Sequence, residues 1–287
     1  MDDYIIIEGL TKSYDGKIAL DNLNLKVSKG EVFGFLGPNG AGKTTTIRMM
    51  TTLTKPSSGK VLINGLDVVR NPKGIKSLIG VVQQHSSLDR DLTVKENIIF
   101  HARLNQIPAS EREWRISELV KYVELEEHVD KMVDSLSGGL KRKVSIVCAL
   151  IRQPEVLFLD EPTVGLDAQS RRKLWDLVRR LNRDGTTIFL TTHYIEEAQA
   201  LCDRVGIIDC GSLIALGTPL ELRQSLGMVT VETLNGNYET DYHYFSDRVE
   251  ATSHVQGLTQ DSDTIIIRDS NLEDVFVELT GKKVGGS

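Results

Sequence analysis

The most informative segment of this sequence is Gly37-Pro38-Asn39-Gly40-Ala41-Gly42-Lys43-Thr44. It fits the pattern G-x-x-x-x-G-K-[ST] and lies between an apolar run, Val32–Leu36, and the helix-compatible stretch Thr44–Thr51. We therefore predict a strand, a glycine-rich loop and a helix. Glycines let backbone N–H groups approach a polyphosphate, and the helix N-terminus adds a favourable dipole. In such a loop, Lys43 supplies charge to the β- and γ-phosphates, and the Thr44 hydroxyl binds Mg²⁺.

An acidic pair, Asp160-Glu161, follows a second apolar run at Val156–Leu159. Ligands of open α/β sheets bind at the carboxyl ends of the strands, so this pair is expected beside the phosphate loop. Asp160 can hold Mg²⁺, and Glu161 can orient and deprotonate an attacking water. Two adjacent acids elsewhere are usually a solvated surface pair, but the upstream nucleotide motif favours chemistry here. The second acid indicates hydrolysis of a nucleotide, because one Asp suffices for metal binding.

A third cluster, Ser137-Gly138-Gly139, precedes the amphipathic stretch Leu140–Ile151. A helix that starts there exposes N–H groups and a hydroxyl, which makes a second anion-binding terminus. Taken alone, Ser-Gly-Gly is more typical of a helix-capping turn.

Composition excludes several classes of protein. Hydrophobic residues make up 40% of the 287 residues and charged residues 26%, which argues against disorder, collagen-like repeats and a disulfide scaffold. The net charge of −6 argues against broad attraction to nucleic acid, and the basic clusters Lys141-Arg142-Lys143 and Arg171-Arg172-Lys173 are interpreted as solvated helix faces. The three cysteines fit neither a zinc site nor a disulfide framework. No apolar run approaches the ~20 residues of a membrane span, so a cytosolic, unprocessed chain is expected.

Periodicity predicts the remaining elements. Alternation at Ile5–Ile7 and again at Leu23–Val27 predicts an N-terminal antiparallel β-layer, with Asp15-Gly16 as a hairpin turn. Strand signals at Val156–Leu159 and Thr187–Thr191 flank a helix, which predicts a parallel βαβ unit. A hairpin is predicted around Cys210-Gly211-Ser212.

Capping boxes mark three predicted helix starts. Thr93-x-x-Glu96 and Ser110-x-x-Glu113 lie in a mostly helical region at about residues 85–154, and Ser270-x-x-Glu273 caps a short helix near the C-terminus. The hydrophobic pattern changes after Gly227, where alternation again predicts short strands. The predicted fold class is α/β, with a P-loop NTPase core around a parallel sheet, the antiparallel β-layer, an inserted helical subdomain and a small C-terminal α+β appendage. The predicted domains are 1–226 and 227–287.

Together these segments resemble the ATP-binding cassette (ABC) family over about residues 4–225. Leu136-Ser137-Gly138-Gly139-Leu140 is similar to the family signature L-S-G-G-Q and lies between the phosphate loop and the acidic pair, although Leu140 departs from the commonest Gln. The resemblance implies that 1–226 is an ATP-binding cassette. It also implies a homodimer, or a dimer with a close paralogue, in which Lys43 and Glu161 of one chain and Ser137 of the other bound one γ-phosphate.

Four further residues acquire expected roles through this resemblance. Tyr14 is similar to the aromatic residue that stacks on adenine, and Gln84 to the glutamine that reaches Mg²⁺ and the attacking water, with Gln83 as its rival. Asp167, in Gly165-Leu166-Asp167, resembles the segment along the dimer seam, although Asp before a helix is also an ordinary N-cap. His193 resembles the switch histidine at the γ-phosphate.

The candidate site divides into three sets. The catalytic set is Glu161, His193 and Gln84. The metal set is Thr44, Gln84 and Asp160. The ATP-binding set is Tyr14, Gly37, Pro38, Asn39, Gly40, Ala41, Gly42, Lys43, Thr44, Thr45, Ser137, Gly138, Gly139 and Asp167.

The resemblance implies an ATPase subunit of a membrane transporter. Such a subunit binds ATP and Mg²⁺, drives separate transmembrane permease subunits through dimer closure, and lies on the cytoplasmic face of the membrane through them. The segment Asn271–Gly281 is similar to the tail of exporter ATPases of the daunorubicin-resistance type, which favours export.

Other functions fit less well. A nucleic-acid-maintenance ATPase of the same superfamily would carry a long heptad insertion or zinc modules, and the interval between Lys43 and Ser137 has neither sustained heptads nor cysteine pairs. A translation factor of the superfamily carries two cassettes, whereas this chain has one phosphate loop. Glu161 and His193 disfavour a binding module without turnover.

Overall fold

A six-stranded sheet forms the centre of the protein. The computed structural model describes residues 3–84, 87–234, 240–258 and 264–281. Five strands of the central sheet are parallel, and the sixth pairs antiparallel at one edge, which confirms the predicted parallel sheet and the hairpin at Cys210. The strand order is β10 (Ser212–Gly217), β9 (Arg204–Asp209), β3 (Val32–Leu36), β8 (Thr187–Thr192), β7 (Val156–Asp160) and β6 (Ile79–Val82).

A four-stranded antiparallel sheet covers one face of the central sheet, as predicted, together with helix α1 (Lys43–Met50). Apolar residues that alternate along the central strands, such as Phe33 and Phe158, point into this layer and lose all exposure. Burial on both faces explains why the central strands are continuous apolar runs. The strand order of this second sheet is β2 (Lys17–Ser28), β1 (Asp3–Tyr14), β4 (Ser58–Ile63) and β5 (Leu66–Asp67).

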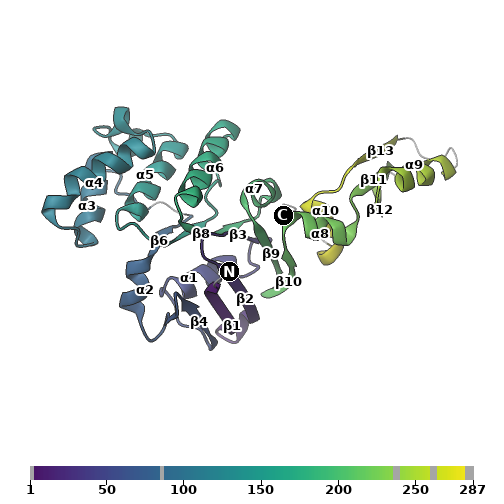
Figure 1. Cartoon of the computed structure of the whole chain (residues 1–287), viewed down its shortest axis with the longest axis horizontal. Helices are drawn as coiled ribbons and strands as arrows, with labels where there is room; N and C mark the ends of the chain where they lie inside the picture. The colour runs from purple at the N-terminus through teal and green to yellow at the C-terminus, as the bar shows by residue number, and fades with distance from the viewer. Residues whose placement is uncertain (1–2, 85–86, 235–239, 259–263, 282–287) are drawn as a thin grey trace.

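Helices cover the other face of the central sheet. Intervening strand residues such as Leu157 and Leu190 join a larger core with helices from the middle and the second half of the chain. Figure 1 shows α3 to α7 on the upper side of the molecule, α8 beside β10 and α10, and α2 (Pro72–Leu78) near the β-layer. No helix within the described residues is long and apolar enough to span a bilayer. The covering helices are α3 (Val94–Leu104), α4 (Ala109–Tyr122), α5 (Gly138–Leu150), α6 (Ala168–Arg183), α7 (Ile195–Leu201) and α8 (Pro219–Leu226), with single 3₁₀ turns at Glu126–His128 and Val133–Ser135.

The two predicted capping boxes of the helical region have different outcomes. The Thr93 box is confirmed, because Thr93 accepts from the Glu96 amide and Glu96 accepts from the Thr93 amide. The Ser110 box is wrong. Helix α4 already begins at Ala109 after Pro108, so Ser110 has helical backbone and lies too far inside the helix to cap it.

A three-stranded antiparallel sheet and two helices form the C-terminal region, at the opposite end of the molecule from α3 and α4 (Figure 1). The predicted Ser270 capping box is wrong by one residue. Asn271 caps the last helix reciprocally with Asp274, because the buried Ser270 hydroxyl instead lies 2.8 Å from Thr230 Oγ1. The elements are β11 (Val229–Leu234), β12 (Thr240–Phe245), α9 (Arg248–Gly257), β13 (Thr264–Asp269) and α10 (Leu272–Thr280).

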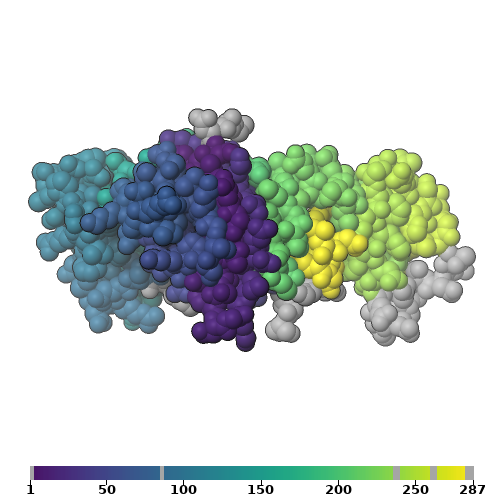
Figure 2. All heavy atoms as spheres, turned by 90° about the horizontal axis from the view of Figure 1, so that it is seen from below, coloured from purple at the N-terminus to yellow at the C-terminus, as the bar shows by residue number. Residues whose placement is uncertain are grey.

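Helix α10 returns from this sheet to the rest of the chain. Leu272, Val275 and Phe276 are buried in the large core that includes Leu222 of α8. Figure 2 shows the yellow C-terminal atoms lying between the green cassette and the yellow-green residues around α9. The predicted boundary at residue 227 therefore crosses a shared core.

Candidate active site

The glycine-rich loop joins the end of β3 to the start of α1 and passes very close to neighbouring backbone. A Cβ atom on Gly37 would collide with the Ile208 carbonyl oxygen of β9, and one on Gly42 would lie 2.7 Å from the Ala19 carbonyl oxygen. Gly42 also has a φ angle of 110°, in the left-handed region. Glycine is therefore required for the path that turns the loop into the N-terminus of α1.

Lys43 is buried at the base of this loop. Its Nζ donates to the carbonyl oxygens of Gly37 (2.8 Å) and Pro38 (3.0 Å), and it lies 3.2 Å from Glu161 Oε1. Burial lowers the pKa of Lys43, and the charge of Glu161 opposes that shift. The buried ammonium group is thus held at the base of the loop, where a phosphate would compensate its charge.

The acidic pair lies at the end of β7, directly across from α1. Asp160 Oδ1 accepts hydrogen bonds from Thr44 Oγ1 (3.2 Å) and Thr191 Oγ1 (2.6 Å). Glu161 has left-handed backbone, with φ at 46°, and its amide donates to Thr191 Oγ1 (3.1 Å). Such backbone costs about 1–3 kcal/mol, and residues that keep it cluster at functional sites.

Three side chains from separate segments converge on the Glu161 carboxylate. Besides Lys43, Gln84 Nε2 donates to Glu161 Oε2 over 3.3 Å, and His193 Nδ1 lies 3.1 Å from the same oxygen. Gln84 follows β6, His193 follows β8, and Glu161 follows β7. These are neighbouring parallel strands, so their carboxyl ends bring the predicted acid, histidine and glutamine to one point.

A pocket of about 230 Å³ lies in front of this cluster. A carboxylate, an amide, an ammonium and backbone N–H groups therefore surround one polar hollow, which is suited to a phosphate chain and a water. Among the residues that the structure describes, the predicted site residues that do not line it are Tyr14, Gly37, Pro38, Ala41, Ser137, Gly138, Gly139, Asp160, Asp167 and His193. The lining residues are Ala19, Asn39, Gly40, Gly42, Lys43, Thr44, Thr45, Gln84 and Glu161.

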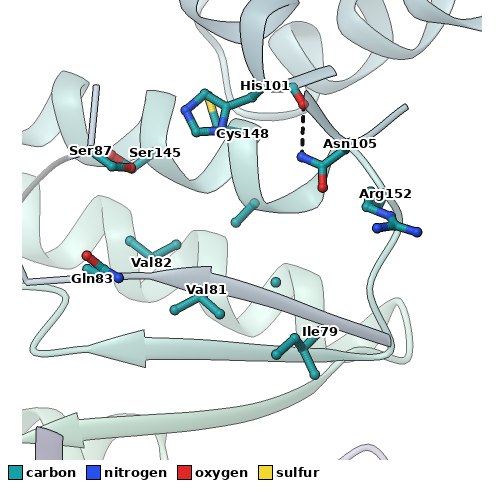
Figure 3. Close-up of a pocket in the computed structure, with 12 residues that line it drawn as sticks. Ile79, Val81, Val82, Gln83, Ser87, His101, Asn105, Ser145, Cys148 and Arg152 are labelled. Carbon is teal, nitrogen blue, oxygen red and sulfur yellow. Dashed lines mark hydrogen bonds between the residues drawn. The ribbon is translucent and has the colours of Figure 1, made fainter. Parts of the chain in front are cut away.

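The two rival glutamines lie in different pockets. Gln84 lines the phosphate-loop pocket, whereas Gln83 lines a hollow of about 140 Å³ between β6 and helices α3 and α5. Figure 3 shows Gln83 at the end of β6, with His101 and Cys148 on the helices across this hollow. The geometry therefore favours Gln84 for a role beside Glu161.

Ser137 and Asp167 both begin helices. Ser137 is the N-cap of α5 and its Oγ accepts from the Leu140 amide at 3.4 Å, while Asp167 caps α6 through the amides of Gln169 and Ser170. Ser137 is exposed. Its hydroxyl and the amides of the first turn of α5 can meet a ligand that approaches the start of the helix.

Tyr14 lies at the end of β1, where 41% of its surface is exposed. The Nζ atom of Lys12 lies 4.8 Å from the centre of its ring. An exposed aromatic face of this kind can stack on a flat base.

Sequence reasoning missed two residues of this region. Thr191 bonds both acids, but a threonine inside an apolar strand carries no signal of its own. The prediction that Lys141-Arg142-Lys143 is a solvated face is wrong for Arg142, which is 8% exposed. Arg142 shares one helix face with Ile146 and Leu150, both buried, and this i, i+4, i+8 spacing is the signal that could have found it.

Comparisons with known proteins agree with this geometry. Residues 20–164 match the family described as ABC transporter. The chain is 39% identical to the daunorubicin resistance ATP-binding protein DrrA3 of Streptomyces coeruleorubidus, with 98% of this chain and 96% of that protein covered. It is 38% identical to the Nod factor export ATP-binding protein I of Ralstonia nicotianae, with 97% and 94% covered. The solved dimer of the ATP-binding cassette MJ0796 bound to ADP and Pi matches with a TM-score of 0.67 and 30% identity, over 75% of this chain and 98% of that one. The chain therefore belongs to the ABC transporter family, as one of its ATP-binding subunits.

Proposed function

We propose that this chain hydrolyses ATP at the Glu161 cluster and uses the reaction to drive export through separate permease subunits. The convergence of Lys43, Gln84 and His193 on the Glu161 carboxylate carries the proposal. Family membership supports ATP turnover, and the names of the two relatives, a drug-resistance protein and an export protein, support the direction of transport. The same relatives favour transport over a role in nucleic-acid maintenance.

The residues of the cluster have three roles in the proposed reaction. The loop amides and Lys43 bind the phosphates, and Glu161 accepts a proton from water as its oxygen attacks the γ-phosphorus. The bond from phosphorus to the bridging oxygen breaks, and ADP and phosphate leave. Gln84 and His193, both in contact with Glu161, hold the carboxylate and the water in line.

Thr44 and Asp160 fit a magnesium site. Their hydroxyl and carboxylate oxygens lie 3.2 Å apart beside the phosphate loop, and Mg²⁺ prefers such hard oxygen donors together with substrate phosphates. We assign Thr44 and Asp160 as its protein ligands, with Gln84 at the same edge. When bound there, Mg²⁺ supplies positive charge against the phosphate oxygens.

Ser137 belongs to a second nucleotide site in this proposal. It begins α5 outside the phosphate-loop pocket, so it can complete a site only from a partner chain. The solved dimer of a related cassette with ADP and Pi supports such a partner. We therefore propose a dimer in which Ser137 and Asp167 face the partner's phosphate loop and Tyr14 meets adenine. Permease subunits then hold the dimer at the cytoplasmic face of the membrane.

Replacement of the proposed base tests this function directly. Glu161→Gln keeps the size of the side chain but cannot accept the proton, so ATP binds and the dimer persists. Size-exclusion chromatography of Glu161→Gln with Mg-ATP should give a dimer, and the same experiment with Lys43→Ala/Glu161→Gln should give a monomer. A Glu161→Gln chain that binds ATP but stays monomeric would argue against the shared site, and one with wild-type turnover would remove Glu161 as the base.

A further inference from the structure

Arg142 connects three segments of the candidate active site. Its Nη1 donates to the Gln83 carbonyl oxygen (2.6 Å), and its Nη2 donates to the carbonyl oxygens of Gln84 and Glu161 (3.3 Å each). Arg142 is the fifth residue of α5, the helix that Ser137 caps. One guanidinium group thus ties that helix to the loops after β6 and β7.

The environment of Arg142 is built for a buried cation. Burial lowers the pKa of the guanidinium, and the carboxylates of Glu197 and Asp160 oppose that shift. A buried charge is costly unless hydrogen bonds and opposite charges compensate it, and here three carbonyl oxygens and two carboxylates do so. A planar guanidinium holds its acceptors in one fixed plane, whereas the three donors of an ammonium group rotate freely.

The two neighbouring basic residues make no such connection. Lys141 donates to the Asp134 carbonyl oxygen (3.0 Å), and Lys143 donates to that of Val123 (2.7 Å). Both acceptors lie within the helical subdomain. Of the three consecutive basic residues 141–143, only Arg142 binds the loops after β6 and β7. Lys141 and Lys143 are therefore matched controls on the same helix.

Arg142 binds the backbone of Gln83, one of the residues that line the hollow between β6 and helices α3 and α5. Gln83, which directly follows β6, and Ser145 of α5 both line that hollow (Figure 3). The guanidinium binds the backbone of Gln83, whose side chain faces the hollow. The hydrogen bonds from Arg142 therefore hold the peptide units that lead into Gln84, and they do not involve the Gln83 side chain.

We propose that Arg142 is a positioning residue that couples the two nucleotide sites of the dimer. The inference rests on the proposed function. Arg142 holds the peptide units of Gln84 and Glu161, which contact one γ-phosphate and its water, in a fixed relation to α5. The start of α5 presents Ser137 to the other nucleotide. When a change in one pocket shifts Gln84 or Glu161, the guanidinium passes the shift to the direction in which Ser137 points.

The test compares Arg142→Met with Lys141→Met and Lys143→Met. Met keeps the length of the buried stem but removes every donor. We expect Arg142→Met to lower kcat on the order of 10-fold to 100-fold, because small misplacements of catalytic groups have effects of this size. The affinity of the isolated chain for Mg-ATP should change less than about 3-fold, since Arg142 does not touch the phosphate loop. In a Glu161→Gln background, Arg142→Met should also weaken ATP-dependent dimerisation, whereas both lysine variants should match the parent in all three measurements.

Two further measurements separate positioning from general damage to the fold. Arg142→Lys retains the charge with fewer directed donors and should give an intermediate kcat at an unchanged melting temperature. Guanidinium ion added at millimolar concentration to Arg142→Gly should restore part of the lost turnover, whereas urea, which is uncharged, should restore less. The proposal is overturned if Arg142→Met turns over ATP and dimerises like Lys141→Met, or if its ATP affinity falls as much as its kcat. The wild type and Lys43→Ala report on the proposed function separately, because an active wild type with an inactive Lys43→Ala upholds ATP hydrolysis whatever Arg142 does.

Discussion

Gly37 determines how closely the phosphate loop approaches β9. An added methyl group at Gly37 would meet the Ile208 carbonyl oxygen, which belongs to the rigid sheet, so the loop must move instead. We expect Gly37→Ala to weaken Mg-ATP binding at least about 10-fold, because displaced loop amides lose hydrogen bonds to charged phosphates. Isothermal titration calorimetry measures this directly. Gly185→Ala is the control, because Gly185 has a φ angle of 96° after α6 and should lower the melting temperature while leaving the affinity intact.

Ser137 distinguishes a simple helix cap from a nucleotide ligand. If its hydroxyl only caps α5, Ser137→Ala costs about 1 kcal/mol of stability and leaves turnover unchanged. If it meets the partner's nucleotide, kcat falls on the order of 100-fold, as for other single donors to a reacting anion, while ATP binding to one chain persists. We expect the second result in steady-state ATPase assays. Thr93→Ala, which removes the capping hydroxyl of α3, should show the loss of stability alone.

At this scale the sequence predicted which side chains meet, but not all of their neighbours. The G-x-x-x-x-G-K-[ST] motif around Lys43 and the apolar strand before Glu161 are enough to predict that these two side chains meet. Parallel strands place their carboxyl ends at one edge of the sheet. Thr191 could not be predicted, since its role depends on strand β8 lying beside β7. Gln84 and Gln83 could be distinguished only by the turn of the chain after β6.

Helix α10 is tied to strand β13 by a part-buried ion pair. Arg268 donates to both carboxylate oxygens of Asp274 (2.7 Å each) and to Glu232 (2.6 Å). Burial alone would raise the pKa of Asp274, but the hydrogen bonds from Arg268 and Asn271 outweigh it and lower the pKa. The charged form of Asp274 is therefore favoured by folding.

This pair predicts an acid-labile C-terminal element. Because the folded pKa of Asp274 lies below the unfolded value of about 3.9, its stabilisation is complete above that value and is lost as pH falls through the folded pKa. Asp274→Asn should lower the free energy of unfolding by about 1.5–3 kcal/mol at pH 7. In the variant, this free energy should also fall less steeply below pH ~4 than it does in the wild type. Hydrogen exchange of residues 264–281 between pH 3 and 7 provides the measurement. Equal protection of wild type and variant at pH 7 would contradict it.

Helix starts show what local sequence patterns can and cannot predict. The Thr93 box formed, and the Thr93 hydroxyl also donates to Glu96 Oε2 (2.8 Å). Ser110 failed because Pro108 fixes the earlier start of α4, and Ser270 failed because Thr230, forty residues away, takes its hydroxyl. A capping box is a pattern of four residues, so it carries no information about such competitors.

The large core extends from β6 and α3 to α10, whereas the β-layer and the C-terminal sheet have separate cores. Phe276 of α10 has no exposed surface, and Phe276→Ala should cost about 3–5 kcal/mol by leaving a cavity in that core. We expect scanning calorimetry to show one main transition at a lower temperature. Val249→Ala, on the 74% exposed Val249 of α9, is the control and should change stability by less than about 0.5 kcal/mol. If the variant instead showed a separate transition at lower temperature while the main transition kept its temperature, the C-terminal region would unfold independently of the core.

The sequence predicted which layers the molecule has, because alternation marks the β-layer, continuous apolar runs mark the buried strands and helical spacing marks the helices. It could not predict the return of α10 to the cassette. The sequence of α10 has the same apolar face whether that face covers the small C-terminal sheet or helix α8, about fifty residues earlier. Only the three-dimensional position of α8 decides between the two.

The place of α10 in the core has a consequence for synthesis on the ribosome. Proteins emerge N-terminus first, and segments generally begin to fold as they appear. The phosphate loop and both acids of this chain leave the ribosome long before Leu272, Val275 and Phe276, so the core beside α8 stays open until then. A nascent chain stopped before Leu272 would carry every side chain of the Glu161 cluster and still expose the apolar surface that chaperones and proteases recognise.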